Sequence, residues 1–206
     1  NLLEPRTTPH ENIQFLLVLS CVLKAVDVHA DLLRESAADP GNDHRLGANE
    51  APPAIISVFL GEQLEDVVEQ LISTGNATKS KKEGVLETGV KTLPDLKKDA
   101  TDRNRTSPFA FTGNKFEFRA AGSSQSCANP NIILNTIVAE AFDEISTQLE
   151  ALSKTDFQKG LQKILQNIVK KHKKVIFNGD GYDESWVKEA EKRGLYNLKT
   201  TPDALA

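Results

Sequence analysis

Apolar and charged side chains alternate strictly in the short sequence Lys-Phe-Glu-Phe-Arg, and this pattern strongly limits how the chain folds. Alternation with a period of two is typical of a strand, so we expect Phe116 and Phe118 to face a core. Lys115, Glu117 and Arg119 then share the opposite face, with neighbours roughly 7 Å apart. A carboxylate and a guanidinium held in this way are able to grip a metal ion and an anionic substrate. An amphipathic strand with a solvated charged face is the simpler alternative.

The overall composition is that of a globular domain. The 206 residues suit one domain or a large part of one, and 39% hydrophobic and 26% charged residues are ordinary values. The formal net charge is only -4, so we expect neither nucleic acid nor a membrane surface as partner. The apolar run 15–22 is much shorter than the ~20 residues that span a bilayer, and we expect a buried helix there.

The cysteines and the first residue bear on the compartment and the extent of the chain. Cys21 and Cys127 lie far apart among apolar or small residues. We therefore expect two buried free thiols in a reducing, cytoplasmic compartment. The chain begins at Asn1 and contains no methionine, which predicts a piece of a longer protein.

The N-terminal half mixes a helix, a strand and a polar region. The capping box Thr8-Pro9-His10-Glu11 predicts a helix that runs to about Arg34. The β-branched and apolar segment 54–60 predicts a strand. We assign residues 61–103 to a surface insertion, which starts with a helix over 62–72 and continues as a polar, lysine-bearing loop.

A hairpin and a helical region make up the C-terminal half. Segments 109–111 and 115–119 predict two strands that turn at 112–114. Residues 131–206 carry apolar side chains at helical spacing, interrupted by a short strand over 175–177. The fold class we expect is α+β, with helices packed on an antiparallel sheet.

Capping signals divide the helical region. Thr155 and Gln158 predict a second capping box. The helix that follows ends in a basic run, where we expect His172 to be a surface histidine. Asp183 is expected to cap the last helix and Gly194 to close it.

Three loops or strand ends collect polar residues. Arg45 and Glu50 share a loop in which they are able to hold a carboxylate and handle a proton, although a surface salt bridge explains them equally well. Segment 103–106 leads into the predicted hairpin, and loop 121–130 leads into a helix whose free N–H groups suit an anion. The zinc spacing, the phosphate-binding loop and the nucleophile elbow are absent from the sequence.

Four short motifs occur in a fixed order along the chain. Arg45-Leu46 precedes Glu50-Ala51-Pro52, the pair Asn104-Arg105 comes next, and Glu117-Phe118-Arg119 is followed by Ala128-Asn129-Pro130. Together these motifs resemble glutamine synthetase. The longer strings 45–55, 122–126 and 197–205 resemble its type III class, and the resemblance covers essentially the whole chain.

The resemblance implies binding roles on the charged strand. Glu117 would ligate a divalent metal, Mg²⁺ or Mn²⁺, on the ATP side of the site. Arg119 and Arg45 would grip the carboxylate groups of the substrate glutamate, a task that suits the planar fork of arginine. Lys115 is the candidate for nucleotide contact.

The resemblance also implies two catalytic residues. Arg105 would neutralise charge on the transferring phosphoryl group. Glu50 would lie on a flap that shields γ-glutamyl phosphate from water and takes a proton from ammonium.

The implied activity is ATP-dependent ligation of ammonia to glutamate in a ring-shaped homo-oligomer. The other metal ligands of the family belong to an upstream segment, so we expect this piece alone to be inactive. A non-catalytic regulatory relative and a glutamate ligase that uses another amine remain alternatives. The pattern of Glu50, Arg105, Glu117 and Arg119 favours a working site over a module that only binds.

Overall fold

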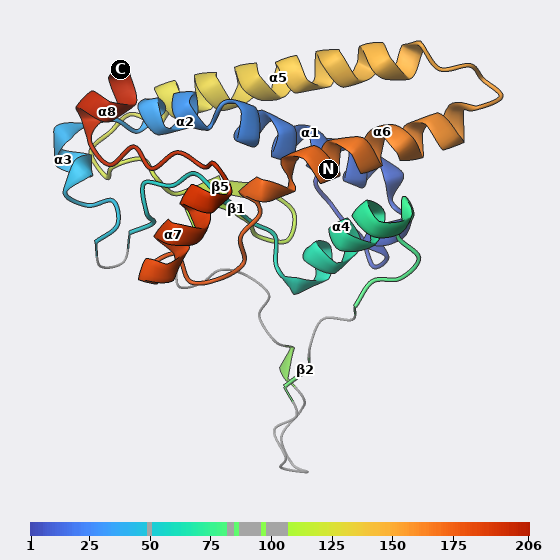
Figure 1. Cartoon of the computed structure of the whole chain (residues 1–206), viewed down its shortest axis with the longest axis horizontal. Helices are drawn as coiled ribbons and strands as arrows, with labels where there is room; N and C mark the ends of the chain where they lie inside the picture. The colour runs from blue at the N-terminus through green and yellow to red at the C-terminus, as the bar shows by residue number, and fades with distance from the viewer. Residues whose placement is uncertain (49–50, 82–84, 87–95, 98–106) are drawn as a thin grey trace.

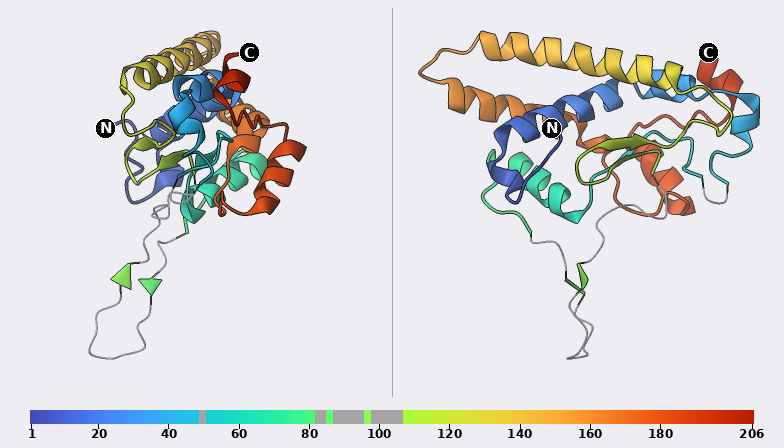
Figure 2. Two further views of the ribbon diagram at one scale, coloured as in Figure 1. Left: turned by 90° about the vertical axis from the view of Figure 1, so that its left-hand side faces the viewer. Right: turned by 180° about the vertical axis from the view of Figure 1, so that it is seen from behind.

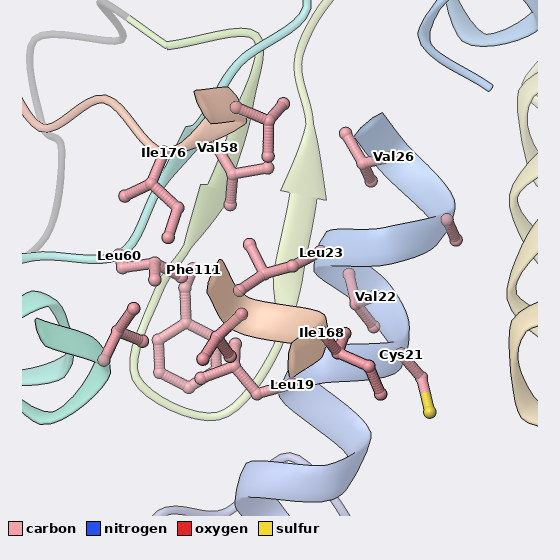
Figure 3. Close-up of a cluster of buried hydrophobic side chains, with 14 of the residues drawn as sticks. Leu19, Cys21, Val22, Leu23, Val26, Val58, Leu60, Phe111, Ile168 and Ile176 are labelled. Atoms are coloured by element: carbon pink, nitrogen blue, oxygen red, sulfur yellow. The ribbon is translucent and has the colours of Figure 1, made fainter. Parts of the chain in front are cut away.

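Helices lie over a small sheet in the computed structural model (Figure 1). The structure describes residues 1–48, 51–81, 85–86, 96–97 and 107–206. Helix α1 (Ile13–Val28) is sandwiched between the long helix α5 (Ala128–Glu150) and the sheet (Figure 1, Figure 3). The expected long first helix is in fact two helices, because α1 ends at Val28 and α2 (Ala30–Ser36) begins after His29.

The start of α1 corrects the predicted capping box. Thr8 makes no capping hydrogen bond, and Pro9–Glu11 forms a separate 3-10 turn. Asn12 caps α1 instead, because its side-chain oxygen accepts a hydrogen bond from the backbone N–H of Phe15 at 3.1 Å. Asparagine is as good an N-cap as serine or threonine, so the chain had two competing signals four residues apart.

The sheet has three strands in the order β1-β4-β5. The predicted hairpin is confirmed: β4 (Phe109–Phe111) pairs antiparallel with β5 (Phe116–Phe118). β1 (Val58–Phe59) is shorter than the predicted strand and pairs parallel with β4. The α+β class is confirmed, although the sheet is mixed and not purely antiparallel.

The segment predicted as a strand over 175–177 contributes only an isolated bridge. Val58 and Ile176 form this bridge in parallel orientation, and the backbone N–H of Phe177 donates to the carbonyl of Val58 at 2.9 Å. Residues Lys173–Val175 form a 3-10 turn, η2, directly before it.

Helix α4 (Glu62–Thr74) belongs to the core, which corrects the description of residues 61–103 as a surface insertion. Its buried side carries Leu64, Val67, Val68 and Leu71, all part of the main hydrophobic cluster. Farther along, β2 (Val85–Leu86) and β3 (Leu96–Lys97) pair antiparallel and lie outside the body of the molecule (Figure 1, Figure 2).

Helices α5 and α6 (Phe157–His172) form a long antiparallel hairpin (Figure 2). The predicted capping box at its turn is wrong, because Asp156 is the N-cap residue of α6 and makes no side-chain capping bond. Asp183 does cap α7 (Glu184–Lys192) through the N–H of Ser185, and Gly194 follows with a φ of 70°. A further short helix, α8 (Thr201–Leu205), ends the chain.

His172 is buried, which corrects its prediction as a surface histidine. Its side chain is 3% exposed, and Nδ1 lies 2.7 Å from Oδ2 of Asp27 on α1. The last turn of α6 packs along α1, so a carboxylate from another part of the sequence supplies the polar partner that burial requires.

The two cysteine thiols differ in their exposure to solvent. Cys21 is buried as predicted, whereas Cys127 is exposed because the loop before α5 runs over the surface. Burial raises the pKa of Cys21 to about 11. Both cysteines are free.

The main core joins elements from the whole chain (Figure 3). Leu19 and Leu23 of α1 meet Val58, Phe111 and Ile168, which come from the sheet and α6. Within the described part of the chain, no helix has both the length and the apolarity needed to cross a membrane.

Candidate functional site

The charged face of β5 holds a hydrogen-bonded cluster. Nε and Nη2 of Arg119 donate to Oε2 of Glu117 at 3.3 and 3.2 Å. Nζ of Lys115 lies 3.6 Å from Oε1 of Glu117, and the hydroxyl of Thr112 donates to the same oxygen at 3.3 Å. The Arg119 side chain is 15% exposed, that of Glu117 40% and that of Lys115 64%, so exposure to solvent increases from Arg119 to Lys115.

Aromatic packing on the other face fixes the direction of these side chains. The rings of Phe109 and Phe116 stack at 4.9 Å between centroids, and Phe111 meets Phe116 edge-on at 5.2 Å. Phe118 is also packed against the core. Because side chains alternate along a strand, this packing turns Glu117 to the charged face. The predicted division of β5 into two faces is therefore confirmed.

The surroundings of Glu117 favour its charged form. Burial alone would raise the pKa of this carboxyl, but the hydrogen bonds and charge of Arg119, the charge of Lys115 and the hydroxyl of Thr112 lower it below its ordinary value. Glu117 is thus an ionised acceptor at neutral pH. An ionised carboxylate is the form that binds a cation.

Arg45 reaches the same region from another part of the chain. Its Nη2 donates to the carbonyls of Ala120 and Ala121 at 2.9 and 3.0 Å, and to that of Arg119 at 3.4 Å. Its Nε donates to Oδ1 of Asn42 at 2.8 Å. The structure therefore brings together two of the three predicted segments, the loop that carries Arg45 and the end of β5.

Glu50 and Arg105, the two predicted catalytic residues, lie outside the described residues, as does Asn104. Their place relative to β5 stays a prediction. Asn42 and Thr112, which the sequence analysis did not select, contact the predicted site residues directly. A signal for Thr112 was its position in the hairpin turn beside Glu117; Asn42 had no comparable local signal.

The described residues do not by themselves form a metal site. No group of three or more histidine, cysteine or acidic side chains suited to a metal ion occurs among them. The closest side-chain partners of Glu117 are Arg119, Lys115 and Thr112, which bring positive charge or a hydroxyl donor and no second carboxylate. Glu117 is at most one ligand of a site completed by other residues.

An apolar hollow of about 450 Å³ lies beside the same hairpin. Phe116 and Phe118 of β5 and Pro130 and Leu134 of α5 contribute to its lining, whereas Glu117 and Arg119 do not. Lys115 also lines the hollow, which therefore adjoins the charged face at that residue.

Comparison with known proteins identifies the class to which this fold and site belong. The sequence profile of the glutamine synthetase C-terminal domain matches residues 160–206. Across its whole length the chain aligns with larger curated relatives, and it belongs to the glutamine synthetase family. The resemblance expected from the four motifs is thus confirmed.

The relatives include a type-3 enzyme. The chain is 52% identical to the Type-3 glutamine synthetase of Dictyostelium discoideum over 209 aligned residues, which cover 100% of this chain and 28% of that protein. It is 43% and 45% identical to the glutamine synthetases of Bacteroides fragilis and Butyrivibrio fibrisolvens, with 29% of each covered. The chain therefore spans less than a third of the length of these relatives.

Proposed function

We propose that this chain is part of the catalytic region of an ATP-dependent glutamate–ammonia ligase, which forms glutamine through γ-glutamyl phosphate. The identity of 52% with a Type-3 glutamine synthetase over the whole chain carries the proposal. The cluster of Glu117, Arg119 and Arg45 supports it, because the chemistry needs fixed cations beside a carboxylate acceptor.

Arg119 and Arg45 are proposed to bind the carboxylates of glutamate. The guanidinium of Arg119 already pairs with the carboxylate of Glu117, which supports a preference for carboxylate oxygens at this position. Nη2 of Arg45 donates to the backbone carbonyl of Arg119 at 3.4 Å, and this proximity supports a shared role of the two residues in glutamate binding.

The remaining roles follow from the needs of the reaction. Arg105 offsets the negative charge of the phosphoryl group during transfer, and Lys115 contacts the nucleotide. Glu50 takes the proton from ammonium, because ammonia attacks the acyl phosphate only as the neutral amine. The loop that carries Glu50 excludes water from that intermediate.

Glu117 is proposed to contribute one carboxylate ligand to Mg²⁺ or Mn²⁺ in the whole protein. Its ionised state supports this role. Since the described residues lack further metal-binding side chains near it, the other ligands must come from elsewhere. We therefore expect the 206-residue chain alone to be inactive, and the whole protein to act in the cytoplasm as a ring-shaped homo-oligomer.

The test is a biosynthetic assay of the full-length protein with glutamate, ATP and ammonium. Glu117→Ala should lower kcat/KM by about 100-fold or more and raise the metal concentration needed for half-maximal activity. Glu150→Ala, on the exposed end of α5, is the matched control and should leave both values unchanged.

Three outcomes would contradict parts of the proposal. Full activity of Glu117→Ala would refute the metal-ligand role. Product formation with an alkyl amine but not with ammonium would identify a different glutamate ligase. No ATP-dependent product with any amine would indicate a non-catalytic relative.

A further inference from the structure

We propose that Asn42 is a positioning residue that holds Arg45 in place for the substrate glutamate, an inference that rests on the proposed function. Asn42 lies in the short helix α3 (Pro40–Asp43) and is 3% exposed. Its side-chain amide connects the segments of both proposed glutamate-binding arginines, because it bonds to Arg45 itself and to the carbonyl of Ala120, directly after Arg119.

The side-chain amide of Asn42 uses both its nitrogen and its oxygen in hydrogen bonds. Its Nδ2 donates to the carbonyls of Ala37 and Ala120, both at 2.8 Å. Its Oδ1 accepts from Nε of Arg45 at 2.8 Å. A buried amide is costly unless its donors and acceptor are satisfied, and here all of them are. The orientation of the amide is therefore fixed, because a flip would place donors against Arg45.

Asn42 is itself held on both sides. The carboxylate of Asp39 caps α3 and accepts from the backbone N–H groups of Gly41 and Asn42. On the other side Asp43 pairs with Arg34 at 3.0 Å. These contacts fix the position of α3, and therefore the position of the amide that bonds to Arg45.

The loop after β5 closes around the same amide. A Cβ atom on Gly122 would lie 3.4 Å from Oδ1 of Asn42, so the backbone passes close to it. The side chain of Gln125 accepts from the N–H of Gly122 at 2.6 Å. Little room is left for Oδ1 to move away from Arg45.

The geometry leaves one nitrogen of Arg45 for a ligand. Nε is bound to Asn42 and Nη2 to backbone carbonyls, while none of the hydrogen bonds of Arg45 within the described chain uses Nη1. Loss of the Asn42 amide removes the partner of Nε, so the guanidinium is held through Nη2 and Nη1 is directed less firmly towards the ligand. The affinity for glutamate should fall, whereas ATP binding, which does not involve Arg45, should not.

The experiment measures steady-state kinetics of the full-length protein with four variants: Asn42→Ala, Arg45→Lys, the double variant and Asp183→Ala. Asn42→Ala should raise the KM for glutamate about tenfold, the effect of one lost hydrogen bond to a charged group, and leave the KM for ATP within about twofold. In the Arg45→Lys background the same change should add less than about twofold, because the shared contact is already lost. Asp183→Ala, which removes the cap of α7, controls for a loss of stability alone and should not change the KM for glutamate.

Several results would overturn the inference. A tenfold effect of Asn42→Ala in both backgrounds would show that Asn42 does not act through Arg45. A lower kcat with unchanged KM, as expected of a destabilised protein, would assign Asn42 a structural role only. If Asn42→Ala does not fold, Asn42→Asp takes its place, because it keeps an oxygen that accepts from Nε of Arg45 but loses the donors to Ala37 and Ala120. The KM for glutamate should then stay within about twofold of the wild-type value, and a tenfold rise would refute the proposal. A wild-type protein that forms no glutamine would refute the proposed function itself, and this inference with it.

Discussion

The buried contact between α1 and α6 allows a sharp test of how burial changes the energy of a histidine–carboxylate pair. His172 and Asp27 are 3% and 6% exposed, and Nδ1 of His172 lies 2.7 Å from Oδ2 of Asp27. His172→Ala removes one partner and leaves the carboxylate of Asp27 inside the protein. Among the described residues, Lys174 is the other ion-pair partner of Asp27, with Nζ 3.4 Å from Oδ1.

The expected cost is about 3 kcal/mol. Removal of one partner from a buried pair costs ~3–5 kcal/mol, because the other group stays buried without compensation. Lys174 recovers part of this, but its side chain is 42% exposed and solvent screens its charge. A local loss of about 3 kcal/mol corresponds to a roughly 100-fold increase in the population of the open state.

Hydrogen exchange of the full-length protein followed by mass spectrometry is the suitable assay, since it reports local opening without requiring two-state unfolding. Peptides from α1 and α6 should exchange about 100-fold faster in His172→Ala. His29→Ala is the matched control, because Nε2 of His29 also lies 2.7 Å from a carboxylate, that of Glu140, but the two side chains are 24% and 55% exposed. A surface pair contributes about 0.2–1 kcal/mol, so its loss should change exchange by less than about fivefold.

Similar rates in the two variants would refute the reasoning. That outcome would mean that burial adds nothing to the contribution of the His172 contact. Fast exchange confined to α6, with α1 unchanged, would also contradict it, because the pair joins the two helices.

Two further predictions concern titratable groups. Because burial raises the pKa of Cys21 to about 11, only about 0.1% of this thiol is ionised at pH 8. Iodoacetamide should therefore modify the exposed Cys127, whereas Cys21 should stay unmodified until the protein unfolds. Peptide mass spectrometry measures the modification at each cysteine. Burial would raise the pKa of Asp43, but hydrogen bonds from Thr201 and the hydrogen bond and charge of Arg34 lower it below its ordinary value. Its carboxylate should therefore stabilise the fold above about pH 4 and lose this effect as the pH falls through the lowered pKa. Melting curves from pH 7 to 3 should show a smaller decline for Asp43→Asn than for the wild type; equal declines would exclude Asp43 as a contributor.

Features governed by neighbouring residues were predictable from the sequence. The alternation of Phe116, Glu117 and Phe118 predicted the strand and its two faces, since side-chain direction follows directly from the backbone of a strand. The cap at Asp183 and the closing Gly194 were predicted because each acts on backbone groups within a few residues. The motif order likewise predicted the family, which the relatives confirm.

Contacts between distant segments decided the rest. His172 stands in a basic run that is typical of a surface, yet Asp27, 145 residues away, turns it into a buried partner. Arg45 and Arg119 were predicted as site residues, but no local pattern indicated that Asn42 would join their segments. The sequence by itself determined which charged side chains share a face of β5, because that depends on the local backbone. Only the tertiary structure decided which buried polar groups hold them, since such a group needs a partner and the fold alone brings that partner near.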